Sequence, residues 1–208
     1  MTNPERLMAA YLRERGIDKD YALRAGARPV DTATATAMGF PLAHRSQGGV
    51  VWPYLHPLTQ EPHPTLMRIR YLGELPRDNE GEEVRFVQPR NSDVEAFFDA
   101  NVDWMSVFRD ESIRIVITEG EAKAIALNQH WREYNAAVVG LGGVWNFRDK
   151  TRDLTPWLRM VRAASQNRRG VLVVLDQDMQ TNKGIRRAGE TLVQLMGLKY
   201  VCKGIATW

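Results

Sequence analysis

Three carboxylates follow two apolar stretches of the chain and are of the type that binds divalent cations. Glu119 comes directly after the stretch 116–118, and Asp176 and Asp178 follow the stretch 173–175. Carboxylates held close together repel one another, and Mg²⁺ or Mn²⁺, which prefer oxygen ligands, relieve that repulsion. If the two stretches are neighbouring strands, these residues predict a metal site that supports phosphoryl transfer.

The same residues have a simpler interpretation. Glu119 and Glu121 stand at the start of a predicted helix, where a negative charge complements the positive end of the helix dipole. For either stretch alone, helix capping and a metal site are equally compatible with the sequence. Carboxylates at the ends of two strands of one sheet favour the metal site, because ligands bind at the carboxyl ends of parallel strands.

Glycines and cations near the carboxylates are of the type that binds phosphate. Gly142 and Gly143 lie in a glycine-rich turn that would let the backbone approach a phosphate. Lys183 and Arg186 open the helix that follows the acidic pair, although a solvated helix face explains these two cations equally well. Together with Lys123, these residues form the predicted phosphate- and nucleotide-binding set.

The second half of the chain alternates between strand and helix patterns. Apolar runs predict strands at 113–118, 136–139, 171–175 and 199–202, and the segments between them predict helices at 121–131, 155–166 and 184–196. Such alternation is typical of a mostly parallel sheet with flanking helices and right-handed crossovers. We therefore expect an α/β domain at residues 111–208 that contains a mostly parallel, four-stranded sheet.

The first 110 residues predict a smaller α+β subdomain. Residues 4–26 carry apolar side chains at helical spacing and predict two short helices, and residues 30–47 predict a loop. Residues 48–90 contain stretches of period-2 alternation and predict a small antiparallel sheet. An aromatic-rich connector at 91–112 completes this half of the chain.

Basic side chains of this antiparallel sheet are the predicted nucleic-acid contacts. Arg68 and Arg70 share one face of a strand, Arg85 lies in the next strand, and Trp52 lies in the first. Cations contact phosphates and aromatic rings stack on bases, so this set suits a single-stranded nucleic acid. A solvated strand face is the simpler alternative, and composition alone favours it.

The composition is that of an ordinary globular protein. The 208 residues carry a net charge of +3 with a pI near 9.1, which permits a polyanionic partner. No stretch approaches the roughly 18 consecutive apolar residues that cross a membrane. The single cysteine, Cys202, excludes an internal disulfide and a structural zinc ribbon. With no apolar signal segment near the N-terminus, we expect a cytoplasmic protein with no membrane partner.

The chain resembles the Toprim domain that is shared by DnaG-type primases, phage primase-helicases, topoisomerases and some nucleases. The resemblance rests on Glu119-Gly120, on Asp176-Gln177-Asp178 and on the small-residue turn 137–143. Upstream, residues 49–54 and 67–70 resemble the basic N-terminal subdomain that leads into primase Toprim domains. Within this group the chain is most similar to the primases of plasmids, phages and other mobile elements.

The resemblance covers about residues 110–202 and implies a role for each carboxylate. Glu119 would be the catalytic acid/base or a metal-associated carboxylate, and Asp176 and Asp178 would be metal ligands. The chain departs from the family at Lys123, which stands where many primases carry an Asp that extends the acidic cluster.

The predicted function is a primase-type nucleotidyltransferase core that uses Mg²⁺ or Mn²⁺, nucleoside triphosphates and a single-stranded DNA template to make short primers. Another protein, a helicase or a replication initiator, would supply unwinding and template choice. Two alternatives stay open. A Toprim nuclease would cleave nucleic acid with the same carboxylates, and a non-catalytic replication accessory protein would bind nucleic acid with a decayed site.

Overall fold

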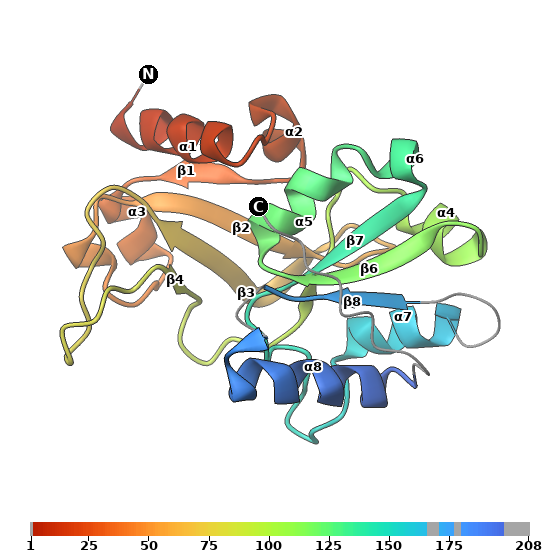
Figure 1. Cartoon of the computed structure of the whole chain (residues 1–208). Coiled ribbons are helices and arrows are strands. Elements are labelled where there is room, and N and C mark those ends of the chain that lie inside the picture. The colour runs from red at the N-terminus through yellow and green to blue at the C-terminus, as the bar shows by residue number, and fades with distance from the viewer. Residues whose placement is uncertain (1, 166–170, 177–179, 198–208) are drawn as a thin grey trace. The chain divides into compact units, whose positions relative to one another are not determined.

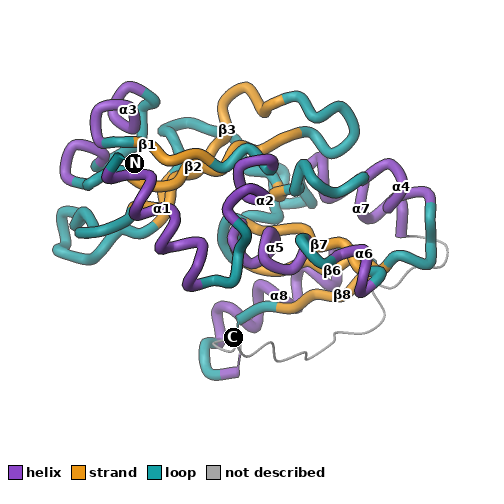
Figure 2. The backbone as a smooth tube through the Cα atoms, turned by 90° about the horizontal axis from the view of Figure 1, so that it is seen from above, coloured by secondary structure: helices purple, strands orange, loops and turns teal. Residues whose placement is uncertain are grey.

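The computed structural model describes residues 2–165, 171–176 and 180–197. The chain forms two compact units, one made of Met1–Tyr54 and Pro62–Asp93, the other of Leu55–Glu61 and Val94–Trp208. Each unit contains a four-stranded sheet (Figures 1 and 2). Among the described residues, no helix is long and apolar enough to cross a membrane.

Unit 1 is an α+β structure built on a sheet of strand order β1-β2-β3-β4. The β1–β2 and β3–β4 pairings are antiparallel. An antiparallel sheet was predicted for residues 48–90, but β1 lies outside that range and was not predicted. Its elements are α1 (Asn3–Glu14), α2 (Lys19–Arg24), β1 (Arg28–Val30), α3 (Thr32–Ala37), the 3₁₀ helix η1 (Ala43–Arg45), β2 (Gly49–Leu55), β3 (Pro62–Tyr71) and β4 (Phe86–Val87).

Capping side chains fix the positions at which α2 and α3 begin. Asp18 is the N-cap of α2, because its side chain accepts a hydrogen bond from the backbone N–H of Tyr21 at 2.7 Å. Residues 30–47 were expected to be a loop, and that expectation is wrong. Asp31 caps the short helix α3 by accepting a hydrogen bond from the backbone N–H of Thr34 at 2.7 Å, and η1 follows.

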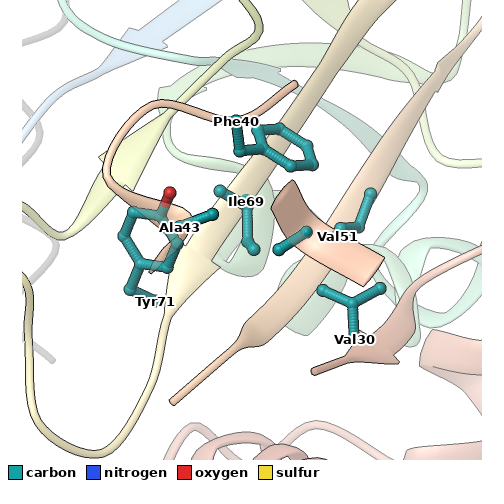
Figure 3. Close-up of a cluster of buried hydrophobic side chains, with 7 residues drawn as sticks. Val30, Phe40, Ala43, Val51, Ile69 and Tyr71 are labelled. Carbon is teal, nitrogen blue, oxygen red and sulfur yellow. The ribbon is translucent and has the colours of Figure 1, made fainter. Parts of the chain in front are cut away.

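The core of unit 1 lies between one face of the sheet and the segment that contains α3 and η1. Val51, Ile69 and Tyr71 point from the strands toward Phe40 and Ala43 (Figure 3). Side chains alternate along β3, so the residues between these core positions belong to the opposite face of the sheet. That opposite face carries Arg68 and Arg70, which confirms that the two arginines share a face.

Unit 2 is an α/β structure whose sheet has the strand order β5-β7-β6-β8. The three described strands that the sequence predicts are β6, β7 and β8, and β6 is parallel to both of its neighbours. The remaining elements include β5, which is antiparallel to β7 and makes the sheet mixed. The bounds are β5 (Ala96–Phe97), α4 (Trp104–Arg109), β6 (Arg114–Glu119), α5 (Glu121–Asn128), α6 (Trp131–Tyr134), β7 (Ala136–Leu141), α7 (Pro156–Ser165), β8 (Val171–Val174) and α8 (Lys183–Leu195).

Helices cover both faces of this sheet. α5 and α6 lie on one face, and α7 and α8 lie on the other (Figures 1 and 2). The predicted fourth strand at 199–202 lies outside the described residues. Within them, the fourth position in the sheet belongs to β5, from the stretch 91–112 that the sequence analysis treated as a connector, and this stretch from Val94 onward belongs to unit 2.

The side chain of Asn128 completes the pairing of β7. Strand β5 pairs only with Gly140 and Leu141, which leaves the middle of β7 without a strand neighbour on that side, within the described residues. Asn128, at the end of α5, is fully buried. It donates to the carbonyl oxygen of Val138 at 2.8 Å and accepts from the N–H of Val138 at 2.7 Å, as a neighbouring strand would.

Replacement of Asn128 by Ala should destabilise unit 2 strongly. The change leaves the buried N–H and C=O of Val138 unsatisfied, which costs about 2 to 4 kcal/mol for the two groups. Chemical denaturation followed by circular dichroism measures this loss. The control is Gln194→Ala, which removes an exposed amide from α8 in the same unit. Equal stabilities of the two variants would contradict the role of Asn128.

Glu95 is a buried carboxyl that caps α7 from a distant part of the chain. Its side chain is 5% exposed and accepts a hydrogen bond from the backbone N–H of Trp157 at 3.2 Å. Burial raises the pKa of Glu95 to about 7, although the hydrogen bond from the backbone N–H of Trp157 and the charge of Arg159 oppose the rise. The folded protein therefore keeps a proton on Glu95 in a pH range where the unfolded chain has lost it.

The contribution of Glu95 to the free energy of unfolding should consequently fall as the pH rises from 4.5 to 7. Below pH 4.5 the carboxyl is neutral in both states, and above pH 7 the folded state carries a buried charge, so the loss is about 1 to 3 kcal/mol. Glu95→Gln keeps the shape of the side chain and should remove this part of the pH dependence. Denaturation curves across the range measure the difference.

Other titrating groups contribute equally to wild type and to the Glu95→Gln variant, so the difference between the two isolates Glu95. Glu190→Gln, an exposed change on α8, should keep the pH dependence of the wild type. If Glu95→Gln and wild type have parallel pH profiles, the raised pKa is disproved.

Candidate functional site

The carboxyl ends of β6, β7 and β8 lie at one edge of the sheet in unit 2. Glu119 is the last residue of β6 and pairs with Leu141, the last residue of β7. On the other side of β6, the register pairs Thr118 with Val174, and Asp176 follows two residues later. Glu119 and Asp176 therefore lie at the carboxyl ends of neighbouring parallel strands, which is the arrangement that the predicted metal site requires. We call this edge, with the turns that leave it, the acidic rim.

Two glycines allow α5 to begin directly at the acidic rim. Gly120 has φ 90° and ψ 142°, a region that only Gly adopts without strain, and it turns the chain from β6 into α5. Gly140, in β7, allows a close approach. A Cβ atom there would lie 3.0 Å from the carbonyl oxygen of Gly120 and 3.2 Å from the Cβ of Ala124. The first turn of α5 therefore packs tightly against the rim.

Lys123 and Asp176 form an ion pair across the acidic rim. The ammonium of Lys123, in the first turn of α5, donates to Oδ1 of Asp176. The side chain of Lys123 is 29% exposed and that of Asp176 is 41% exposed, so the pair is only partly accessible to water. Lys123 thus contacts a carboxylate that was predicted to bind metal.

The described part of the rim supplies two of the three predicted carboxylates. Asp178 lies outside the described residues, and among the described residues no group of three or more His, Cys, Asp or Glu could hold a metal ion. Glu119 and Asp176 are anionic oxygen donors, which fit Mg²⁺ or Mn²⁺ in kind. At Asp176, however, a cation would meet the ammonium of Lys123.

Three of the predicted phosphate-binding residues, Lys123, Gly142 and Gly143, lie at this edge of the sheet. Gly142 and Gly143 follow the end of β7 directly, so their backbone lies at the acidic rim. Lys183 is the first residue of α8, the helix that follows the acidic pair. Arg186 lies one turn further along α8 and donates to the carbonyl oxygen of Gln180 at 2.6 Å.

An aromatic cluster beside the glycine turn was missed by the sequence analysis. The ring of Trp145 is stacked on that of Phe147, with centroids 5.9 Å apart, and the guanidinium of Arg148 lies 5.0 Å from the centroid of Trp145. Trp145 is 40% exposed. The position of Trp145 two residues after Gly143 could have indicated this role, because an exposed ring beside a phosphate-binding turn can stack on a base.

Unit 1 carries a separate group of arginines and aromatic rings, which we call the arginine cluster: Tyr11, Arg15, Arg68, Arg70, Arg85 and Phe86. The guanidinium of Arg15 lies 3.9 Å from the ring centroid of Tyr11, and those of Arg68 and Arg70 lie 5.3 Å and 5.0 Å from that of Phe86. Burial lowers the pKa of Arg70, and the positive charges of Arg15 and Arg85 act in the same direction.

Exposure divides the predicted nucleic-acid contacts. Arg85 is exposed, whereas Arg70 is half-buried and Arg68 is 9% exposed. Phe86, which was not among the predicted contacts, is also exposed. Trp52 is fully buried, so its ring cannot stack on a base, and its predicted role as a contact is wrong. β2 is buried on both faces near Trp52, and alternation in the sequence does not distinguish such a strand from a half-exposed one.

Two solved structures are similar to the chain. The first, described as the structure of the DnaG catalytic core, has a TM-score of 0.55 and 14% identity, and the match covers 93% of this chain and 61% of that one. The second, described as the primase fragment of the bacteriophage T7 primase-helicase protein, has a TM-score of 0.45 and 17% identity, with 95% and 64% covered. The chain thus spans about three fifths of the length of these proteins.

The likeness to the DnaG core shows a common fold. None of the curated proteins compared with the chain matches it. Residues 103–208, from the start of α4 onward, match the family described as "Domain of unknown function (DUF3854)". The match covers just over half of the chain and includes the whole acidic rim. The chain belongs to the DUF3854 family.

Proposed function

We propose that the chain is the core of a metal-dependent, primase-type nucleotidyltransferase of the Toprim class. It would make short primers on single-stranded DNA during the replication of a plasmid, phage or other mobile element. The observation that carries the proposal is the position of Glu119 and Asp176 at the adjacent carboxyl ends of two parallel strands, in a fold like that of the DnaG catalytic core.

The acidic rim would supply the chemistry of chain extension. In that reaction the 3′-hydroxyl oxygen of the primer bonds to the α-phosphorus of a nucleoside triphosphate, and the bond to pyrophosphate breaks. Glu119 would accept the proton of the attacking hydroxyl. Mg²⁺ or Mn²⁺, held by Glu119, Asp176 and Asp178, would neutralise the charge that develops on the phosphate oxygens.

The residues around the rim would hold the triphosphate. Lys183, Arg186 and the backbone N–H groups of Gly142 and Gly143 are suited to its anionic oxygens, and Trp145 is suited to stacking on the base. The arginine cluster of unit 1 would contact the single-stranded template through its exposed members. We further propose that a helicase or replication initiator acts with the chain, and that the protein works in the cytoplasm.

Primer synthesis by purified protein tests the proposal. Wild type should incorporate labelled nucleotides on single-stranded templates with Mg²⁺ or Mn²⁺, and Glu119→Gln should lower the rate by about 10²- to 10⁴-fold, the usual contribution of a general base. Glu133→Gln, an exposed change on α6 in the same unit, is the control and should leave the rate unchanged. Inactivity of the wild type across metals and templates would contradict the proposal.

One observation favours a second candidate, a non-catalytic accessory protein that binds nucleic acid. The ion pair between Lys123 and Asp176 already neutralises one of the carboxylates that catalysis would need. In that case DNA binding would persist without metal and without nucleotide incorporation. Cleavage of DNA in the presence of Mn²⁺ and the absence of nucleotides would instead identify a nuclease.

The arginine cluster predicts which variants weaken template binding. Phe86→Ala should weaken the binding of single-stranded DNA by about 5- to 150-fold, because stacking on one base contributes about 1 to 3 kcal/mol. Arg85→Gln should weaken binding and lower the dependence of log K on log salt by about one phosphate contact. Fluorescence anisotropy at several salt concentrations measures both effects.

Arg28→Gln is the matched control for this prediction. Arg28 is exposed on β1, at the opposite edge of the same sheet, and the change removes the same charge. If Arg28→Gln and Arg85→Gln weaken binding equally, only net charge matters, and the arginine cluster is not the binding surface.

A further inference from the structure

Lys123 contacts a carboxylate that a divalent cation at the acidic rim would also use. Its ammonium donates to Oδ1 of Asp176, and the two residues are 53 positions apart in the chain. The contact is set by the fold, because Asp176 follows β8 and Lys123 lies in the first turn of the helix that follows the neighbouring strand, β6. Gly120 and Gly140 hold that first turn close to the rim.

An ammonium and a divalent cation hinder each other's binding to this carboxylate. Each needs a direct contact with the carboxylate, at about 2.8 Å for the nitrogen and about 2.1 Å for Mg²⁺. Two positive charges so close together would also repel each other strongly in a partly dehydrated site. The lysine side chain has a flexible four-carbon stem, so Lys123 can leave Asp176 without a change in the backbone.

We propose that Lys123 and a divalent cation compete for Asp176, so that Lys123 lowers the metal affinity of the acidic rim. The inference rests on the proposed function only in taking the rim to be the site of metal binding. When a cation binds Asp176, Lys123 swings away and its ammonium becomes available to the phosphates of a nucleotide. Metal and triphosphate then strengthen each other's binding, because each favours the same position of the lysine.

Metal binding without turnover tests the competition. The affinity for Mn²⁺ alone is measured by electron paramagnetic resonance of the free ion, for wild type, Lys123→Gln and Lys123→Arg. Removal of the charge in Lys123→Gln should raise the affinity about tenfold or more, the usual effect of a neighbouring charge on an ionic equilibrium. Lys123→Arg keeps the ion pair and should bind Mn²⁺ as weakly as the wild type.

Two further variants test whether the gain in Mn²⁺ affinity arises at Asp176. Lys150→Gln removes an equal charge from an exposed position of unit 2 and should change the affinity by less than about twofold, which is the effect expected of a screened surface charge. Adding Asp176→Asn to Lys123→Gln should abolish the gain. Circular dichroism of each variant verifies that it is folded.

Three results would overturn the proposal. They are an unchanged or lower Mn²⁺ affinity in Lys123→Gln, an equal gain in Lys150→Gln, and a gain that survives Asp176→Asn. None of these depends on nucleotide incorporation, so they are distinguishable from a failure of the proposed function, which is measured by primer synthesis. A gain in metal affinity without primer synthesis would support the competition and contradict the polymerase activity.

Discussion

The parallel pairing of β6 with β7 and β8 is the constraint on which the candidate site depends. It aligns the carboxyl ends of three strands, and it brings together Glu119 and Asp176 from distant parts of the sequence. The pairing also fixes where α5 begins, because the backbone N–H of Gly120 donates to the carbonyl oxygen of Leu141 at 2.7 Å. Lys123 is thereby placed within reach of Asp176. The ion pair at the acidic rim therefore depends on the register of the strands.

Charged side chains are arranged differently in the two units. In unit 2 a cation and an anion meet at the rim and balance each other. In unit 1 the arginine cluster brings several guanidinium groups against two aromatic rings, and burial lowers the pKa of Arg70 there. Exposed guanidinium groups can contact phosphates, which is why we propose that this surface binds the template.

Much of unit 2 could be predicted from sequence because its signals are local. Apolar runs that end in a carboxylate predicted β6 and β8. The partner of Lys123 could not be predicted, because it is 53 residues away and depends on the register of β8. β5 was also missed, since a strand of two residues has no period of its own and forms only by pairing with β7.

In unit 1 the shared face of Arg68 and Arg70 was predictable from period-2 alternation, but the burial of Trp52 and Arg68 was not. Alternation identifies two faces of a strand without showing which of them other elements cover. Here Tyr11 of α1 lies beside Arg70, with its ring centroid 5.9 Å from the guanidinium carbon, on the face that was expected to be open. The docking of α1 therefore contributes to the burial of Arg70.

The most direct test of the central claim is to locate a nucleotide-bound metal ion. Anomalous diffraction from crystals grown with Mn²⁺ and a non-hydrolysable nucleoside triphosphate would give its position. The account predicts a Mn²⁺ ion bound by Glu119 and Asp176, with the phosphates beside Gly142 and Lys183 and with Lys123 turned away from Asp176. A nucleotide bound elsewhere, or a rim in which Lys123 stays paired with Asp176 at saturating Mn²⁺ and nucleotide, would contradict it.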